Sequence, residues 1–271
     1  MEPSIISVCT PERTGDRAAW VVERCGGPLF TVNRWVPAGF ERYIQICPPA
    51  WRMPTNRREY EFSPSDRDPR YPCNLTPVPW ATVAAARGHA IGLHTCFHDL
   101  TPHTEMQSAQ PGDYLGPLEE TPTGAMIDAV GEAVLSFSGA GQECLVAVWS
   151  GFGSREIDQL HARKAAMITG MGQQEHFLLS ADVATVIGTW RSLLPDQPVS
   201  ASSVASRSPQ AIWPATREWF YAVPFDWHSS FFAGPASLAT TLLKDERIES
   251  YPVALDADYR RGRRPDCFIG P

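Results

Sequence analysis

The stretch that decides the fold class is residues 123–149, TGAMIDAVGEAVLSFSGAGQECLVAVW, in which a helical pattern runs directly into a buried strand. Apolar residues recur at three- and four-residue steps over 123–137, which predicts an amphipathic helix. Glycines within 139–141 end this helix. Residues 144–149 have the apolar, β-branched composition of a strand. The unit is therefore a helix followed by a strand.

Outward from this unit, the same criteria predict further elements. Strands are expected at residues 43–47, 176–179 and 219–223, and helices at 80–87, from Ser180 to about Leu194, and after Pro235. Residues 20–25 and 29–32 are expected to form a β-hairpin, because Gly26-Gly27 can supply the positive φ of a tight turn. The order lacks the regular alternation of a doubly wound sheet. The sequence therefore predicts an α+β fold, with helices packed on a mixed or antiparallel sheet.

The domain organisation is expected to be simple. Residues 17–253 are predicted to form a single domain, after a flexible N-terminal tail at 1–16. Residues 254–271 are expected to be a basic C-terminal tail, since four arginines fall within 260–264. Residues 195–209 are rich in serine and proline and are a candidate linker within the domain.

Composition excludes several classes of protein. Hydrophobic residues make up 43% and charged residues 20% of the 271 residues, as in soluble globular proteins. No apolar run reaches the roughly 18 residues of a membrane helix, and the N-terminus has no secretory signal. We therefore expect a cytoplasmic protein without a membrane partner. The net charge of −7 makes nucleic acid an unfavoured partner.

The seven cysteines form no recognisable framework. Their number is odd, they are widely spaced, and no CxxC pair occurs. Secreted disulfide-rich domains and zinc ribbons have denser, paired cysteines. The cysteines are therefore expected to be reduced thiols that pack as small hydrophobic groups.

A histidine cluster is the first candidate site. Four of the seven histidines fall within fifteen residues, at His89, His94, His98 and His103. If residues 91–100 are extended, His94, Cys96 and His98 point to one face. Three ligands and a water make the open coordination of catalytic zinc.

Two kinds of chemistry are conceivable for this cluster. A metal-assisted hydrolase would hold one divalent transition metal through His94, His98 and His103, with Asp99 or Glu105 as base. A thiol mechanism would use Cys96, whose thiolate needs a lowered pKa and a nearby base. The spacing matches no defined metal motif, however, and imidazoles on a loop need no ligand. The favoured expectation is no cofactor, with the metal as the alternative.

An aromatic segment is the second candidate site, formed by Trp219, Asp226, Trp227 and His228. Asp226 and His228 lie two residues apart, so in a strand they would share a face as an acid–base pair. The aromatic density could also form a binding platform. The favoured interpretation is a core strand that ends in a polar loop, with Asp226 accepting hydrogen bonds from turn amides.

Several segments in one order resemble a family of uncharacterised actinobacterial proteins. They are VPAGFERY at 36–43, Pro49-Ala50, WATVAAARG at 80–88, EMQ at 105–107, AVWSGFG at 147–153, Trp213-Pro214, Trp219 and GPASL at 234–238. The resemblance spans about residues 36–253. It stresses aromatic and turn residues, which build a scaffold, and does not include the histidine cluster. It implies no activity and no catalytic residue.

The catalytic signatures with a defined mechanism are missing from the sequence. It contains no GxSxG, no Walker A loop and no HExxH, and Gly151-Phe-Gly153 lacks the third glycine of a dinucleotide fingerprint. An acidic scaffold rich in tryptophan favours a non-enzymatic protein-binding protein, such as an immunity or inhibitor protein that recognises a basic partner. The metal-assisted hydrolase is the alternative.

Overall fold

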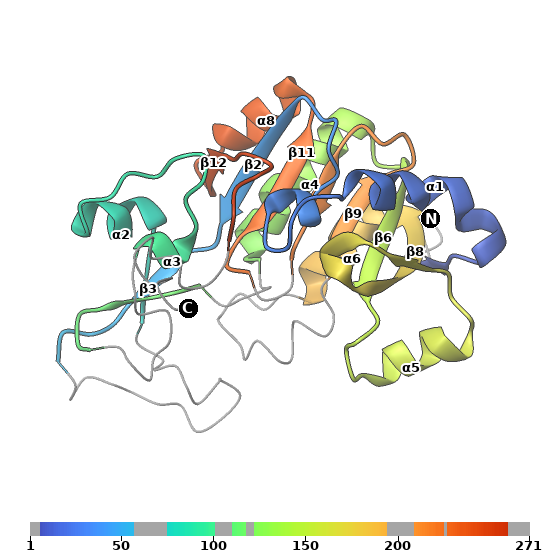
Figure 1. Cartoon of the computed structure of the whole chain (residues 1–271), viewed down its shortest axis with the longest axis horizontal. Helices are drawn as coiled ribbons and strands as arrows, with labels where there is room; N and C mark the ends of the chain where they lie inside the picture. Colours follow the sequence, from blue (N-terminus) through green and yellow to red (C-terminus); the bar gives the residue numbers. More distant parts are fainter. Residues whose placement is uncertain are drawn as a thin grey trace, which may run out of the picture.

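The computed structural model of the chain describes residues 6–56, 75–100, 110–117, 122–193, 209–224 and 227–259. These residues form an α+β fold with one large sheet and a smaller sheet near one end (Figure 1). Every strand pair in these ranges is antiparallel. The α+β class predicted from the sequence is confirmed.

Within the described residues, the large sheet has nine strands in the order β1-β8-β6-β9-β10-β11-β2-β12, with β7 also paired to β8. They are β1 (Ser7–Val8), β2 (Arg42–Cys47), β6 (Glu143–Trp149), β7 (Met167–Thr169), β8 (Glu175–Asp182), β9 (Ala211–Pro214), β10 (Phe220–Ala222), β11 (Ser230–Gly234) and β12 (Glu249–Pro252). The small sheet has the order β4-β3-β5, formed by β4 (Thr76–Val78), β3 (Ala50–Arg52) and β5 (Tyr114–Leu115). The strands predicted at 43–47, 144–149, 176–179 and 219–223 are confirmed.

Helices pack on both faces of the large sheet. The helices are α1 (Pro11–Arg24), α2 (Trp80–Ala86), α3 (Phe97–Leu100), α4 (Gly124–Ser138), α5 (Arg155–Ala162), α6 (Val183–Leu193) and α8 (Ala236–Leu243), with 3-10 turns η1 (Val32–Arg34) and η4 (Met171–Gln173). Helices α4, α6 and α8 share one core with the sheet, whereas α1, η1 and η4 share the other. The helices predicted at 80–87, at 123–137 and after Pro235 are confirmed. In the ranges described, no helix has both the length and the apolar content to cross a bilayer.

The central strands are apolar throughout because both of their faces are covered. In β10, Phe220 and Ala222 lie in the core that contains α1, and Tyr221 lies in the core that contains α4. In β11, Phe231 and Phe232 divide between the same two cores. Alternate strand residues point to opposite faces, so a strand buried on both sides becomes a continuous apolar run.

Helices α4 and α6 begin at side-chain caps. Thr123 Oγ1 accepts a hydrogen bond from the backbone N–H of Met126 at 3.3 Å, which caps α4. Asp182 Oδ1 accepts from Thr185 N–H at 2.8 Å at the start of α6. The sequence prediction that Ser180 caps this helix is wrong, because β8 continues through Ser180, which pairs with Leu145 of β6.

The β-hairpin predicted over residues 20–32 is also wrong. Residues 20–24 belong to α1, and its buried positions Ala18, Val21 and Cys25 follow helical spacing. Neither Gly26 nor Gly27 has the positive φ that a tight hairpin turn requires. Part of the segment expected to be a flexible tail, residues 1–16, forms β1 and the first turns of α1.

Residues 253–259 complete the core on the α1 side. Val32 N–H donates to Ala257 O at 3.1 Å, and Tyr259 N–H donates to Phe30 O at 2.8 Å. The Tyr259 ring stacks on Trp227, with centroids 4.7 Å apart. The first residues of the predicted C-terminal tail are therefore part of the packed structure. Arg260–Arg264 and residues 195–208 of the candidate linker lie outside the described residues.

The cysteines behave as the sequence predicts where the structure describes them. Cys9, Cys25, Cys47, Cys96 and Cys144 are buried and free. Burial raises the pKa of Cys144 to about 12, so this thiol stays protonated at neutral pH. These residues act as small hydrophobic groups in the packing.

Candidate binding site

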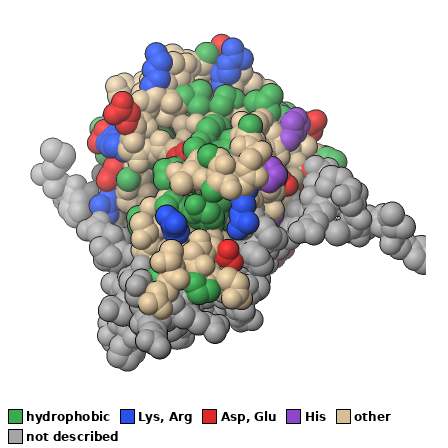
Figure 2. Space-filling view, turned by 90° about the vertical axis from the view of Figure 1, so that its left-hand side faces the viewer, with side chains coloured by type: hydrophobic (Ala, Val, Ile, Leu, Met, Phe, Trp, Pro, Cys, Tyr) green, Lys and Arg blue, Asp and Glu red, His purple; other side chains and the backbone are tan. Residues whose placement is uncertain are grey.

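An open cleft of about 400 Å³ lies where the sheet edge at β12 meets the start of α4 and the segment from β4 to α2. We call it the β12 cleft. It is lined by Cys47, Pro49, Pro77, Val78, Pro79, Thr123, Ala125, Met126, Glu246, Arg247, Ile248 and Glu249. Its volume falls in the range of ligand sites. Figure 2 shows the end of the molecule where α2 lies, with apolar side chains gathered among scattered charged ones.

Prolines form one wall of the β12 cleft. Pro77 lies in β4, an edge strand of the small sheet, opposite Trp51 of β3. Pro79 is the residue before α2, with φ −62° and ψ 151°. The proline ring fixes φ and provides no backbone donor. This wall is therefore stiff and offers a ligand apolar contact without N–H groups at the proline positions.

Glu249 ties the edge strand β12 to α2. Its carboxylate accepts hydrogen bonds from Trp80 N–H at 2.5 Å and Ala81 N–H at 2.7 Å. The hydroxyl of Tyr251 also donates to it, at 2.6 Å. A carboxylate at the first turn of a helix satisfies free backbone donors and is favoured by the helix dipole. Glu249 therefore fixes the position of the proline wall relative to the sheet.

Charges at the rim of the β12 cleft are predominantly acidic. The Arg247 guanidinium binds Asp245 at 2.6 Å and Glu132 at 2.9 Å, so two carboxylates neutralise this cation. The hydrogen bond from Arg247 holds the pKa of Asp245 below its ordinary value. Glu246 is exposed and makes no ion pair with another described residue. The negative charge of Glu246 is therefore available to a ligand.

Two sulfur-containing residues that are almost fully buried, Cys47 and Met126, also line the β12 cleft. Burial raises the pKa of the Cys47 thiol well above its ordinary value, so it stays protonated. The Met126 thioether accepts from Thr123 N–H at 3.4 Å. A protonated thiol and a thioether make an apolar, polarizable lining and not a nucleophilic one.

The structure separates the histidines that the sequence grouped. His94 is exposed, and its Nδ1 lies 3.9 Å from Asp256 Oδ1. His98 lies in α3, and its ring centroid is 4.9 Å from that of His228. Residues 91–100 do not form the extended segment on which the shared face of His94, Cys96 and His98 depended, because the chain turns at Gly92 and continues into α3. His103 lies outside the described residues.

The proposed chemistry of this segment finds little support in its geometry. Among the residues that the structure describes, no three histidine, cysteine, aspartate or glutamate side chains are placed to hold a metal ion. His89 is exposed just beyond α2. Cys96 is buried, and burial raises its pKa to about 12, which disfavours a thiolate. A metal bound through residues outside the described ranges stays a prediction.

The aromatic segment is divided between the two cores. Trp219 is 1% exposed, and its indole N–H donates to Ser138 Oγ at 2.8 Å. Trp227 packs on the other side of the sheet, against Tyr259 and Phe231. His228 is buried against Phe97 and His98. These side chains form no common surface, and Asp226 lies outside the described residues.

A buried polar network lies between the large sheet and α3, and sequence reasoning missed it. The Gln45 amide N–H₂ donates to Ser229 Oγ at 3.2 Å and contacts Cys47 Sγ at 3.3 Å. The Tyr259 hydroxyl donates to Gln45 Oε1. Burial raises the pKa of Tyr259 well above its ordinary value. The network is internal to the packing, so its role is structural.

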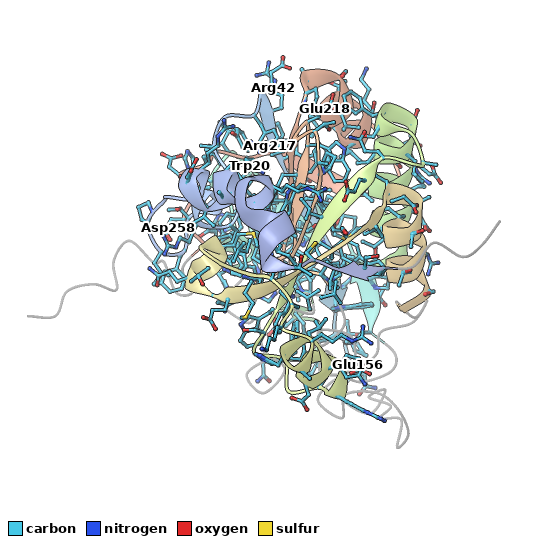
Figure 3. All side chains as sticks on the ribbon, turned by 90° about the vertical axis from the view of Figure 1, so that its right-hand side faces the viewer. Trp20, Arg42, Glu156, Arg217, Glu218 and Asp258 are labelled. Carbon is cyan, nitrogen blue, oxygen red and sulfur yellow. The ribbon has the colours of Figure 1, made fainter. Side chains whose placement is uncertain are left out.

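The far end of the molecule carries a second charged feature. The guanidinium carbons of Arg24 and Arg217 lie 5.7 Å and 5.8 Å from the ring centroid of Trp20. Figure 3 shows Arg217 beside Trp20 and Glu218 at this end. The Arg24 contact lies within α1, whereas the Arg217 contact joins α1 to the turn between β9 and β10. We therefore assign these arginines a structural role in packing around Trp20.

The residues of the β12 cleft come from four separate parts of the chain. Sequence reasoning did not group them, because no spacing relates residues 47–49, 77–79, 123–126 and 246–249. The one local signal was the charged run at 245–249, which follows α8. That run alone does not indicate a cleft.

Comparison with known proteins identifies no relative. No family model matches the chain, and no curated protein or solved structure matches it. Functional inference therefore rests on the contacts and charges of the described residues.

Proposed function

We propose that this chain is a cytoplasmic, non-enzymatic binding protein, comparable to an immunity or inhibitor protein, that recognises a basic protein partner at the β12 cleft. The observation that carries the proposal is the exposed carboxylate of Glu246 beside an apolar cleft whose own cation is already neutralised. Opposite charges at an interface speed association and reject wrong partners.

Two further observations support this proposal. The net charge of −7 favours a basic partner at long range. The thiols of Cys47 and Cys96 are buried, and burial raises their pKa values, so neither thiol offers a reactive group to a substrate. The accessible cleft instead offers shape, apolar contact and charge, which are the requirements of recognition.

A capture experiment with matched variants tests this function. The tagged full-length chain, its Glu246→Lys variant and its Glu23→Lys variant are used as baits in a lysate of the source organism. Glu23 is an exposed residue of α1 that does not line the β12 cleft. We expect the chain and Glu23→Lys to retain one basic protein in a 1:1 complex and Glu246→Lys to lose it.

Charge screening provides the second arm of this test. Exposed charge pairs weaken when salt shortens the Debye length from about 10 Å at 0.1 M to about 3 Å at 1 M. Retention of the partner should therefore fall as salt rises. Equal retention by Glu246→Lys and Glu23→Lys, or capture of an acidic protein only, would show that the β12 cleft does not recognise a basic partner.

A further inference from the structure

We infer that the β12 cleft receives a single long cationic side chain, lysine or arginine, as the anchor of the bound partner. This inference rests on the proposed function and specifies which chemical group of the partner enters the cleft. It is carried by three features of the cleft: its volume, its apolar lining, and its supply of hydrogen-bond acceptors.

The volume favours a side chain over an element of secondary structure. The cleft measures about 400 Å³. A single turn of α-helix, about 10 Å wide and about 5.4 Å long, already fills about 400 Å³. One turn of a partner helix would take up all of this space, whereas one projecting side chain with its hydration fits within it. Side chains held in pockets of this kind are the usual energetic centre of an interface.

The apolar lining suits the stem of a lysine or arginine. Pro77, Pro79, Met126 and Ile248 contribute apolar surface to the cleft. Long cationic side chains bury their methylene groups along such surfaces and keep the charged head at the rim. The head would then meet Glu246, which the sequence places two residues before Ile248.

Four backbone donors around the cleft are already used. Arg247 N–H binds Asp245 Oδ1 at 3.0 Å, and Ile248 N–H binds Asp245 O at 3.2 Å. Thr123 N–H and Met126 N–H bind each other's side chains at 3.4 Å and 3.3 Å. An anionic ligand, which can only accept hydrogen bonds, could not use these four donors.

Glu246 supplies free hydrogen-bond acceptors at the rim. The Glu246 carboxylate accepts only, and lysine and arginine heads donate only. Arg247 does not cancel this charge, because its Nε and Nη2 atoms bind Asp245 and Glu132. The Arg247 guanidinium at this rim is already bound by two carboxylates. A cationic side chain of the partner would bind the Glu246 carboxylate in the same way.

Amino-acid probes test the anchor without the partner. The full-length chain is labelled with ¹³C at its methionine methyl groups and titrated with Nα-acetyl-arginine methylamide, Nα-acetyl-lysine methylamide and the uncharged Nα-acetyl-norleucine methylamide. We expect a saturable shift of the Met126 methyl resonance with the cationic probes. The buried Met53 and Met171, which do not line the cleft, serve as internal references.

Variants separate charge from shape in this titration. Glu246→Gln should weaken the cationic probes about two- to fivefold, the usual worth of an exposed charge pair. Glu23→Gln should leave them unchanged. Ala125→Trp, at an exposed position that lines the cleft, should block all probes by filling it. Unchanged circular dichroism of each variant shows that folding is intact.

The outcomes distinguish the anchor from the proposed function. An unmoved Met126 methyl, or norleucine binding as tightly as the cationic probes, would overturn the anchor. If the partner is nevertheless captured in a Glu246-dependent way, the function holds and docking occurs on the rim alone. If the probes bind but capture is equal in Glu246→Lys and Glu23→Lys, the anchor chemistry holds and the proposed function fails.

Discussion

At the scale of single residues, His176 is a buried titratable group whose pKa is strongly lowered by burial. It lies in β8 with 0% exposure, and its ring packs edge-on against Trp35 with centroids 6.2 Å apart. Burial lowers the pKa of His176 to about 4, from an ordinary value of 6.5. The imidazole is therefore neutral in the folded protein under conditions where the unfolded chain binds a proton.

The sign of the resulting pH dependence follows from this difference. Below pH 6.5 the unfolded chain takes up the proton first, so His176 costs stability as the pH falls toward 4. The loss over this window is about 3 kcal/mol, since one pKa unit corresponds to about 1.4 kcal/mol. We expect His176→Phe, which keeps a ring against Trp35, to lose less stability than the unmodified chain between pH 7 and pH 4. Urea unfolding at several pH values gives the free energy of unfolding of each protein as a function of pH. The same loss of stability in both proteins between pH 7 and pH 4 would contradict the prediction.

At the scale of elements, the contact between α4 and α6 depends on one glycine. A methyl group at Gly131 would lie 2.5 Å from Ile187 Cγ2, whereas one at Gly188 of α6 would meet no atom within 4 Å. Both glycines lie inside helices, where alanine is ordinarily favoured by about 1 kcal/mol. We expect Gly188→Ala to stabilise the protein by about 0.5–1 kcal/mol and Gly131→Ala to destabilise it by about 1–3 kcal/mol through overpacking.

Denaturant unfolding of the two alanine variants checks this pair. Gly188→Ala is the matched control, because it makes the same chemical change in the partner helix without the clash. Combining Gly131→Ala with Ile187→Val should not restore stability, since valine retains a Cγ2 methyl, whereas Ile187→Ala should relieve the clash. Equal effects at Gly131 and Gly188 would show that the two helices do not approach closely.

The elements that could be predicted are those whose sequence pattern fits only one type of secondary structure. Residues 219–223 can only be a buried strand, and α4 shows its apolar stripe clearly. The segment over α1 carries two patterns at once. Ala18, Val21 and Cys25 have helical spacing, but the neighbouring valines and Gly26-Gly27 also fit a hairpin. Tertiary packing against the sheet decides in favour of the helix, and no local rule contains that packing.

At the scale of the whole molecule, the β12 cleft exists because the sheet order brings distant segments together. β2 pairs with both β11 and β12, so the charged run after α8 reaches the edge beside Pro49. The Glu249 carboxylate then joins this edge to α2 by accepting hydrogen bonds from the first backbone N–H groups of the helix, which lies about 170 residues earlier in the chain. Register and strand order are long-range properties, so the candidate site could not be predicted from spacing. The candidates that the sequence did offer, the histidines and tryptophans, are distributed through packing and loops.

The two ends of the described chain close the same core, which yields a prediction for the molecule as a whole. Residues 253–259 bind the turn at residues 30–33 through three backbone hydrogen bonds, and Tyr259 stacks on Trp227. A chain that ends at Pro252 would expose the α1 core and leave the Gln45 amide oxygen without the Tyr259 hydroxyl. Loss of a buried aromatic residue alone costs about 3–5 kcal/mol. We therefore expect this truncated chain to be unfolded or to melt far below the full-length protein.

The matched control is a chain that ends at Tyr259, which keeps every contact described for residues 253–259. It should unfold cooperatively and at about the same temperature as the full-length chain, because the packing of Tyr259 and Ala257 on the core is intact. Thermal unfolding followed by near-ultraviolet circular dichroism compares the three proteins, since Trp227 reports directly on the stack. If the chain ending at Pro252 melts together with the full-length chain, residues 253–259 are a tail after all. If instead both truncations fail to fold, the core needs residues beyond Tyr259, and the closure described here is incomplete.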